Sequence, residues 1–131
     1  MSPVRDAVVA VIRREERVLM VRRGPDAPMA GCWAPPGGRI EPGETQEEAV
    51  SREVREELGL EVRPVEKVWE CPTHDGGYLL HWWLAEASAG EIRPDPAEVS
   101  EARWILPEEF DDLEPTFEAH RPFFEEILPT L

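Results

Sequence analysis

The sequence lacks several features that would place it in well-known classes of protein. It has only two cysteines, Cys32 and Cys71, without a CxxC motif or a matching histidine pair, so they indicate neither a disulfide framework nor a zinc site. No apolar run approaches the roughly 20 residues of a membrane-spanning helix. The short apolar stretch near the N-terminus is followed at once by arginine and glutamate, which is not typical of a signal peptide. We therefore expect a soluble, cytoplasmic protein with ordinary thiols.

Positive charge is also scarce. The chain carries 14 Lys and Arg residues against 28 Asp and Glu residues, a formal net charge of -14. A protein that binds a nucleic-acid polymer needs a basic stripe to displace counterions, so this balance argues against such a partner. A small polyphosphate remains possible, because divalent cations and a few arginines outweigh distant acidic groups that salt screens. The length of 131 residues fits one domain, 1–131, with its own core.

Apolar patterns predict strands before and after a central helix. Residues 6–23 indicate a β-hairpin whose two β-rich runs flank a Glu-Glu pair. Residues 60–72 and 77–87 predict a second hairpin, joined at Asp75-Gly76. A proline-bearing loop and a short strand over residues 101–106 follow. Sheet is therefore expected on both sides of the helix in sequence.

The central helix has clear local boundaries. Residues 24–44 are rich in glycine and proline and predict a loop. Thr45 is a suitable N-cap, and Glu48 three residues later completes a capping box. Gly59 is the expected C-terminal stop, so the helix should run over residues 46–58.

The C-terminal region predicts further helix. Pro107 suits the first position of a helical turn over residues 107–113. A last helix is expected over residues 116–127, where aromatic and aliphatic residues recur near helical spacing. Pro122 must kink or divide that helix, because proline has no N–H to donate.

Three carboxylates share one face of the central helix. Glu53, Glu56 and Glu57 are separated by three and four residues, so they are neighbours on the helix surface. Like charges at this spacing cost roughly 0.2–0.5 kcal/mol per pair, and a bound cation would reverse that sign. The alternative is a solvated face with ion pairs such as Glu48 with Arg52.

The surrounding segment resembles the Nudix box, in which Gly is followed after five residues by Glu, and after seven more by Arg-Glu-apolar-any-Glu-Glu-any-Gly-apolar. Residues 38–60 read GRIEPGETQEEAVSREVREELGL, and every fixed position is met: Gly38, Glu44, Arg52, Glu53, Val54, Glu56, Glu57, Gly59 and Leu60. The preceding segment, RRGPDAPMAGCWAPPGG, is similar to the MutT-like branch. The resemblance implies an α/β (α+β) Nudix fold, with a mixed β-sheet sandwiched between helices.

A divalent metal site follows from the same resemblance. Mg²⁺ is the expected cofactor, with Mn²⁺ possible, because both ions prefer oxygen ligands. The implied metal-binding residues are Glu53, Glu56, Glu57, Gly38 and Glu98.

The resemblance also implies roles for the residues around the metal. Arg52 would orient a carboxylate through a forked pair, and Glu44 would support the site. Glu98 occupies the place of a late-loop glutamate ahead of a tryptophan strand, with Glu101 as its competitor. The catalytic residues are thus expected among Glu53, Glu56, Glu98 and Arg52, and the identity of the general base stays open among the three glutamates.

Substrate contacts are expected from an arginine and from aromatic residues. Arg23 corresponds to an arginine that touches the nucleotide in MutT-like relatives. Trp33 and Tyr78 are candidates to stack on a base, as are Trp82 and Trp83. Trp82 and Trp83 cannot both line one pocket, because adjacent residues of a strand alternate faces.

Other residues bear on the choice of substrate. For the three histidines, His74, His81 and His120, a structural role is the better expectation, although Phe117 or His120 could approach the base. MutT-like enzymes read a purine with an asparagine on the last helix, and this chain has no asparagine. Tyr78 lies at the spacing past the box that is typical of dinucleoside-polyphosphate hydrolases.

The reaction implied is Mg²⁺-dependent pyrophosphohydrolysis of a nucleoside diphosphate-linked substrate. A nucleoside triphosphate cut to a monophosphate and pyrophosphate is the favoured substrate. The alternatives are an ADP-ribose or dinucleoside-polyphosphate hydrolase, a nucleotide-sensing Nudix module without catalysis, and a non-catalytic cation-binding or interaction domain. The expected partner is a small nucleotide, with no nucleic-acid polymer and no membrane, and the protein is expected to be a monomer or homodimer.

Overall fold

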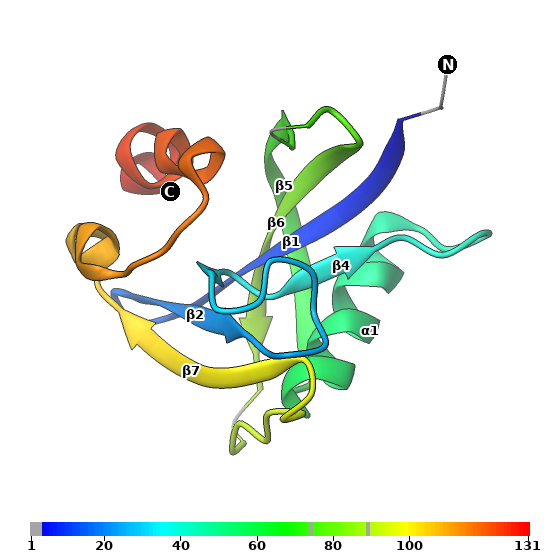
Figure 1. The fold of residues 1–131 in the computed structure, drawn as a ribbon, viewed down its shortest axis with the longest axis horizontal. Helices are drawn as coiled ribbons and strands as arrows, with labels where there is room; N and C mark the ends of the chain where they lie inside the picture. Colours follow the sequence, from blue (N-terminus) through cyan, green and yellow to red (C-terminus); the bar gives the residue numbers. More distant parts are fainter. Residues whose placement is uncertain (1–3, 74, 89) are drawn as a thin grey trace.

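The computed structural model describes residues 4–73, 75–88 and 90–131 (Figure 1). These ranges contain a seven-stranded sheet, one α-helix and several short helical segments. The strands and the α-helix are β1 Arg5–Arg14, β2 Arg17–Arg23, β3 Trp33–Ala34, β4 Gly37–Arg39, α1 Gln46–Leu58, β5 Val62–Pro72, β6 Tyr78–Ala87 and β7 Val99–Ile105. The C-terminal segments are η1 Pro107–Asp112, η2 Glu118–His120, η3 Phe123–Ile127 and η4 Leu128–Thr130.

The sheet is mixed, as predicted. Its strand order is β3-β2-β1-β6-β5, with β4 paired to β1 and β7 paired to β2. The β1–β6 pair is parallel and the others are antiparallel. Both predicted hairpins are confirmed, since β1 turns into β2 at Arg14 and Arg17, and β5 pairs with β6 over its whole length. β1 therefore lies at the centre of the sheet.

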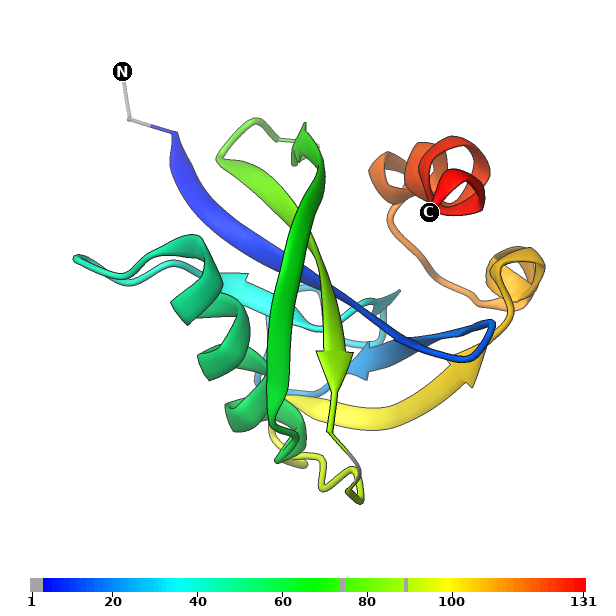
Figure 2. The same ribbon diagram turned by 180° about the vertical axis from the view of Figure 1, so that it is seen from behind.

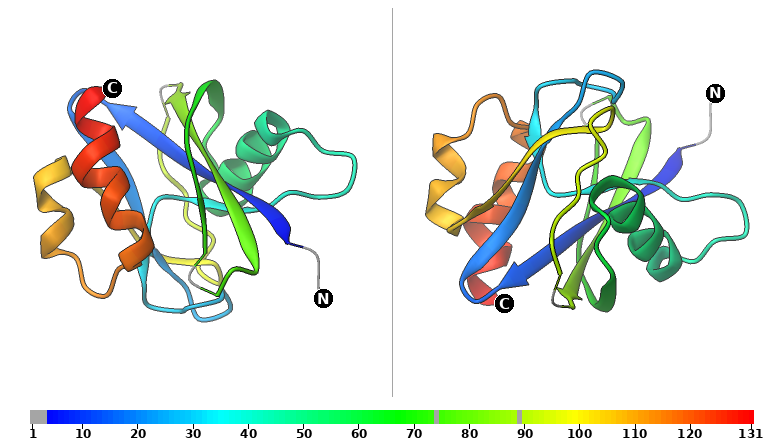
Figure 3. Two further views of the ribbon diagram at one scale, coloured as in Figure 1. Left: turned by 90° about the horizontal axis from the view of Figure 1, so that it is seen from above. Right: turned by 90° about the horizontal axis from the view of Figure 1, so that it is seen from below.

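Each face of the sheet has its own hydrophobic core. The side chains of Val8, Ala10 and Ile12 pack on the side of α1, with Val50 and Val54 of the helix. The alternate β1 residues, Val9 and Val11, pack on the opposite side, with the C-terminal segments. Figures 2 and 3 show the strands between α1 on one side and the C-terminal segments on the other. The predicted arrangement of a sheet between helices is confirmed.

The helix α1 has the bounds that its sequence predicts. The N–H of Glu48 donates to Thr45 Oγ1 at 3.1 Å, and the Thr45 N–H donates to Glu48 Oε1 at 3.0 Å. Gly59 ends the helix in a left-handed conformation with φ 65°, and its N–H donates to the Arg55 carbonyl at 2.9 Å. Both caps depend on residues that are close in sequence, so they can be predicted from the sequence alone.

Two predictions are corrected by the structure. The predicted loop 24–44 contains the short strands β3 and β4, because backbone partners on β2 and β1 lie alongside it. The predicted helix 116–127 begins later, because Thr116 forms a bridge with Trp33. Residues 118–130 form one unbroken helical run, and its pitch changes around Pro122, from a 3-10 turn through a short α turn to a π-helical turn and a final 3-10 turn. β7 also begins two residues earlier than the predicted strand.

The buried polar groups of the sheet are mostly satisfied. His81 is buried, its Nε2 lies 2.8 Å from Asp6 Oδ1, and its Nδ1 lies 2.8 Å from Lys67 Nζ. The expected structural role of His81 agrees with these contacts, whereas His74 lies outside the described residues. Both cysteines are buried free thiols. Within the described ranges we find no helix with the length and apolarity needed to cross a membrane.

Candidate active site

Two of the box glutamates lie against the backbone of β4. The Gly37 N–H donates to Glu57 Oε2 at 3.2 Å. A methyl group placed on Gly38 would lie 2.5 Å from the carboxyl carbon of Glu53, closer than van der Waals contact allows. A side chain at position 38 would therefore displace the Glu53 carboxylate.

Arg52 links Glu53 to two further carboxylates of the box, Glu44 and Glu56. Its Nε and Nη2 donate to the two oxygens of Glu44 at 2.7 and 2.9 Å, which is the forked pair that the sequence predicts. Its Nη1 donates to Glu53 at 2.9 Å and to Glu56 at 3.2 Å. The side chain of Arg52 is 17% exposed, whereas that of Glu56 is 59% exposed. Glu53 is thus fixed from the side of Arg52, and Glu56 keeps access to solvent.

The alternative ion pair of Arg52 with Glu48 does not form. Glu48 accepts from the Thr45 N–H as part of the capping box. Arg52 turns toward the loop before the helix, where its Nη2 also donates to the Arg39 carbonyl at 2.9 Å. The helix face is therefore organised around the box residues, and it is not a row of surface ion pairs.

The surroundings of Glu53 and Glu57, the two glutamates beside β4, disfavour their ionised forms. The pKa of Glu57 is raised to about 8, mainly by burial and also by the neighbouring charges of Glu53 and Glu98, against the opposing effects of Arg23 and the Gly37 N–H. Burial also raises the pKa of Glu53, although its bond with Arg52 opposes that shift. A cation placed between these carboxylates would relieve the repulsion and favour their ionised forms.

The donor set fits a hard divalent cation. Mg²⁺ and Mn²⁺ take carboxylate and carbonyl oxygens, and Glu53, Glu56 and Glu57 offer these from one helix face. Among the described residues, no three His, Cys, Asp or Glu side chains are gathered closely enough to hold a metal ion. Instead, the guanidinium group of Arg52 forms ion pairs with both Glu53 and Glu56. Metal binding would thus require these carboxylates to move toward Glu57.

Glu98 and Glu101, the two candidates for the late-loop glutamate, have different surroundings in the structure. Glu98 precedes β7 and its charge acts on Glu57, while its carbonyl accepts from the Gly24 N–H at 2.8 Å. Glu101 lies within β7, where its carboxylate pairs with Arg103 at 2.8 Å. Glu98 is therefore the candidate that lies within electrostatic reach of the box carboxylates.

The substrate candidates have different positions. Arg23 is the last residue of β2 and lies near both the box and the C-terminal segments. Its charge acts on Glu57, and its guanidinium carbon lies 5.9 Å from the centre of the Phe117 ring. Its Nε donates to the Pro28 carbonyl. Tyr78 begins β6 and is half-buried. Trp33 is only 4% exposed and belongs to the core, so its expected stacking on a base is corrected.

Trp82 and Trp83 lie on opposite faces of β6, as the alternation predicts. Trp82 is fully buried and stacks on Phe123, with ring centres 4.4 Å apart. Trp83 packs on the α1 side, where its Nε1 donates to Gln46 Oε1 at 2.9 Å. Both rings have structural partners.

His120 is the unusual histidine of the structure. It is 7% exposed between Trp82 and Phe117, and its Nδ1 has no hydrogen-bond partner within the described ranges. Its pKa is lowered to about 4, mainly by burial and in part by the charge of Arg23. The imidazole is therefore neutral at pH 7.

This shift predicts a pH dependence of stability. The unfolded chain has the ordinary histidine pKa and binds a proton more readily than the native state, so stability is lost as the pH falls from about 6.5 toward 4. His120 should contribute up to about 3 kcal/mol to this loss. The measurement is urea unfolding of wild type and His120→Leu at pH 7 and pH 4.5. The variant should lose less free energy of unfolding than wild type; equal losses would contradict the assignment.

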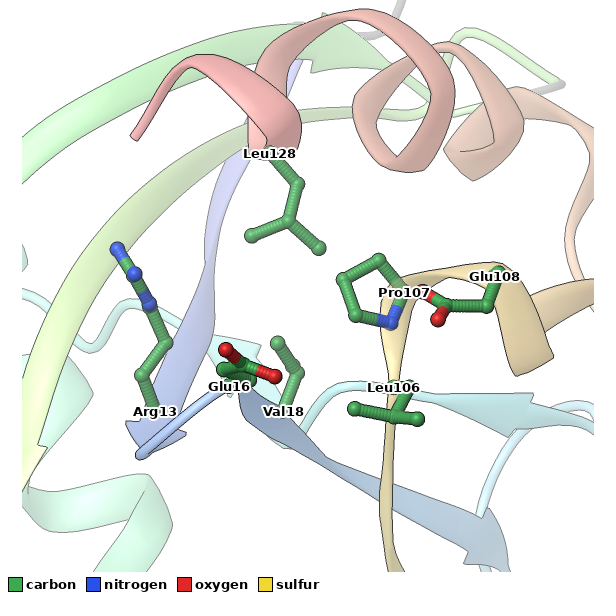
Figure 4. Close-up of a pocket in the computed structure, with 7 residues that line it drawn as sticks. All are labelled: Arg13, Glu16, Val18, Leu106, Pro107, Glu108 and Leu128. Carbon is green, nitrogen blue, oxygen red and sulfur yellow. The ribbon is translucent and has the colours of Figure 1, made fainter.

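Two shallow surface hollows of the described structure contain none of the box residues. The first, of about 280 Å³, lies between the β1–β2 turn and the C-terminal segments, with Arg13, Glu16 and Glu108 at its rim (Figure 4). The second, of about 580 Å³, is lined by residues of η1 and the segment after it. The box residues thus lie outside both hollows, at a half-buried contact of α1 with β4 where Glu56 is the exposed carboxylate.

The fold and the site define a class. The protein is an α+β domain in which a capped helix presents the complete Nudix box to a glycine pair on the central sheet. The family model described as the NUDIX domain matches residues 3–127, and the chain belongs to the Nudix hydrolase family.

The comparisons also identify relatives. The NAD-capped RNA hydrolase NudC of Deinococcus radiodurans is 36% identical over 132 residues, which cover 98% of this chain and 46% of that protein. The CTP pyrophosphohydrolase of Escherichia coli is 34% identical over 106 residues, which cover 79% of this chain and 77% of that protein. The chain thus spans about half the length of the NudC relatives and a larger share of the second protein.

Solved structures agree with the fold. The crystal structure of a MutT NUDIX hydrolase from Burkholderia pseudomallei has a TM-score of 0.82 and 30% identity, covering 95% of this chain and 98% of that one. The MutT protein from Methanosarcina mazei has a TM-score of 0.80 and 27% identity, covering 94% and 91%. The resemblance to MutT-like proteins is confirmed.

Proposed function

We propose that the protein is a Mg²⁺-dependent pyrophosphohydrolase that cuts a nucleoside triphosphate to a monophosphate and pyrophosphate. The observation that carries this proposal is the arrangement of Arg52, which fixes Glu44 and Glu53 while Glu57 bonds to the β4 backbone. Mg²⁺ held by Glu53, Glu56 and Glu57 would neutralise phosphate charge and lower the pKa of a bound water. Mn²⁺ is expected to substitute for it.

The protein's own residues have separate tasks in this proposal. Arg52 keeps Glu53 oriented through a guanidinium that Glu44 holds by two bonds. Glu56 is more exposed than Glu53 or Glu57, and the charge of Glu98 acts on Glu57, so we expect Glu56, Glu98 or Glu53 to accept the proton of the attacking water. Arg23, whose charge acts on Glu57, would contact the nucleotide.

A second candidate is a substrate in which the nucleoside diphosphate is linked to another nucleoside. Several of the relatives are named as NAD-capped RNA hydrolases, and NAD contains two nucleosides joined by a pyrophosphate. The relative named for CTP matches this chain over a larger share of its own length, which supports the triphosphate. We also propose a cytoplasmic protein that acts on small nucleotides as a monomer or homodimer, with no membrane partner. The excess of acid argues against a polymer as substrate.

The test is phosphate and pyrophosphate release with Mg²⁺ from nucleoside triphosphates, ADP-ribose, dinucleoside polyphosphates and NAD. We expect pyrophosphate from the triphosphates and loss of turnover with EDTA. Turnover of ADP-ribose or the dinucleotides alone would replace the first candidate by the second. Binding of nucleotide and Mg²⁺ without any turnover would indicate a sensing module, and Mg²⁺ binding without nucleotide binding would indicate a cation-binding domain.

The role of Arg52 gives a specific prediction. Arg52→Lys should lower Mg²⁺ affinity or kcat/KM by roughly 10–100-fold, because an ammonium group cannot make the forked pair with Glu44 and also reach Glu53. The control is Arg55→Lys, since Arg55 is exposed on the same helix and its one ion pair within residues 4–73, 75–88 and 90–131 is with Glu61 at 3.1 Å. Calorimetric Mg²⁺ titration and steady-state kinetics provide the measurements. Equal effects of the two substitutions would contradict the role of Arg52.

A further inference from the structure

Five residues form one patch on the sheet beside the candidate active site. We call it the β1 patch, and its members are Arg5 and Ala7 of β1, Arg39 of β4, and Tyr78 and Leu80 of β6. Their positions follow from the strand registers: Ala7 is opposite Arg39 on one side and Leu80 on the other, and Arg5 is opposite Tyr78. Residues opposite each other in a sheet project to the same face.

The β1 patch lies on the face away from α1. Val8 and Gly38 are register partners, and Gly38 faces Glu53 of α1. Ala7 and Arg39, one residue away on each strand, therefore face the other side. Leu80 confirms this, because it packs with the core beneath the C-terminal segments. Arg5 and Arg39 are exposed, and Tyr78 and Leu80 are half-buried.

The two arginines of the patch, Arg5 and Arg39, have no polar side-chain partner among the described residues. Neither side chain forms an ion pair or a hydrogen bond with any residue in the described part of the chain, although the protein carries a net charge of -14. By contrast, Arg52 and Arg121 each bind three or more carboxylates. Two unpaired guanidinium groups on one sheet face favour a ligand that brings hydrogen-bond acceptors.

The patch also has a direction relative to the box. Arg39 directly follows the glycines that contact Glu57 and Glu53. Arg5 and Tyr78 lie one row farther along β1, about 7 Å beyond the row of Arg39. The box glutamates lie on the α1 side of β4, and the only strand that pairs with β4 in the described sheet is β1. A nucleotide with its phosphates at the box would therefore pass around the other edge of β4 to reach Arg39, and then Arg5 and Tyr78, on the opposite face.

We propose that the base of the substrate stacks on Tyr78 and is read by Arg5, while Arg39 binds a phosphate. This inference rests on the proposed action on nucleoside triphosphates. Aromatic rings stack on every base, so Tyr78 supplies affinity without choosing among the bases. Selection comes from Arg5, because a guanidinium carries several N–H donors and no acceptor.

Donor-only recognition selects particular bases. Guanine presents two neighbouring acceptors, O6 and N7, and this is the edge that arginine contacts with two bonds. Cytosine likewise presents O2 and N3 as neighbouring acceptors. Adenine has a donor beside N7, and uracil carries a proton on N3, so neither offers Arg5 such a pair. The substrate class is therefore nucleotides of cytosine and guanine, in preference to those of uracil and adenine.

The test is calorimetric binding of CMP, UMP, GMP and AMP to the whole chain, which does not require turnover. Wild type should bind CMP and GMP on the order of tenfold more tightly than UMP and AMP. Arg5→Gln should abolish this preference, since an amide offers one donor and one acceptor. Arg39→Gln is the matched control on the same face, and it should weaken all four nucleotides by a similar factor.

The outcomes separate this inference from the proposed function. A preference that is lost in Arg5→Gln and kept in Arg39→Gln supports base reading by Arg5, even if no triphosphate is cut. Equal weakening of all four nucleotides in Arg5→Gln would overturn it and assign Arg5 to phosphate. Wild-type binding without base preference would also overturn it, whether or not pyrophosphate is released from triphosphates.

Discussion

Glu57→Gln is expected to lower kcat on the order of a thousandfold, because loss of one metal ligand removes several kcal/mol of charge stabilisation at the reacting phosphate. Glu57 is the box glutamate that bonds to the β4 backbone, where its Oε2 accepts from the Gly37 N–H. Glutamine keeps an oxygen for that bond and removes only the negative charge. The measurement is steady-state turnover with Mg²⁺ of the triphosphate that wild type cuts.

The same substitution should leave the fold intact. Burial and the charge of Glu53 raise the pKa of Glu57, so its ionised form is unfavourable in the protein without metal. Removing that charge should leave the melting temperature unchanged or raise it. Glu47→Gln is the control, since Glu47 is exposed in the first turn of the same helix and does not belong to the box. Turnover by Glu57→Gln equal to that of the control would remove Glu57 from the metal site.

The parts of the fold that the sequence predicts well are those with local causes. The bounds of α1 are set by a capping box within four residues and by Gly59, whose left-handed conformation ends the helix. The two hairpins depend on turns between adjacent runs, so they too could be predicted. The parallel pairing of β1 with β6 joins segments about 70 residues apart, and no local pattern specifies it.

The predictions that the structure corrects concern segments whose conformation depends on distant parts of the chain. Residues Gly37–Arg39 form β4 only because Ala7–Val9 of β1 lie alongside, and the glycine-rich composition of the segment predicts a loop. The C-terminal region forms the helical run that its periodicity predicts, but the run begins at Glu118 and its pitch changes around Pro122. Its burial against Trp82 stabilises these turns, and this tertiary contact cannot be read from periodicity.

The candidate site divides in the same way. The box names Arg52 and its glutamates, and the helix period alone places Glu53, Glu56 and Glu57 on one face. The β1 patch was missed, because Arg5 and Arg39 meet only through the pairing of β1 with β4 and β6. The alternation of β1 does place Arg5 and Ala7 on one face, which was the one available signal.

Gly38→Ala is expected to lower kcat/KM on the order of a hundredfold with little loss of stability. A methyl group at position 38 would lie 2.5 Å from the Glu53 carboxyl carbon and at similar distances from both carboxylate oxygens. These atoms are the end of a flexible side chain, so they can move away at small cost in free energy of unfolding. Displacing a catalytic group by about 1 Å can nevertheless cost on the order of 10²-fold in rate.

Gly90→Ala is the matched control, because, apart from its neighbours in the chain, no atom of the described residues lies within 4 Å of a methyl group at that position. Both variants should unfold at urea concentrations close to that of wild type, and only Gly38→Ala should lose activity and Mg²⁺ affinity. Both stability and activity must be measured, because a variant that loses activity and stability together would indicate damage to β4 itself. Retention of full Mg²⁺ affinity and turnover in Gly38→Ala would show that the position of the Glu53 carboxylate against β4 is unimportant. Glu53 would then have to bind metal from another orientation, with its bond to Arg52 as the remaining constraint.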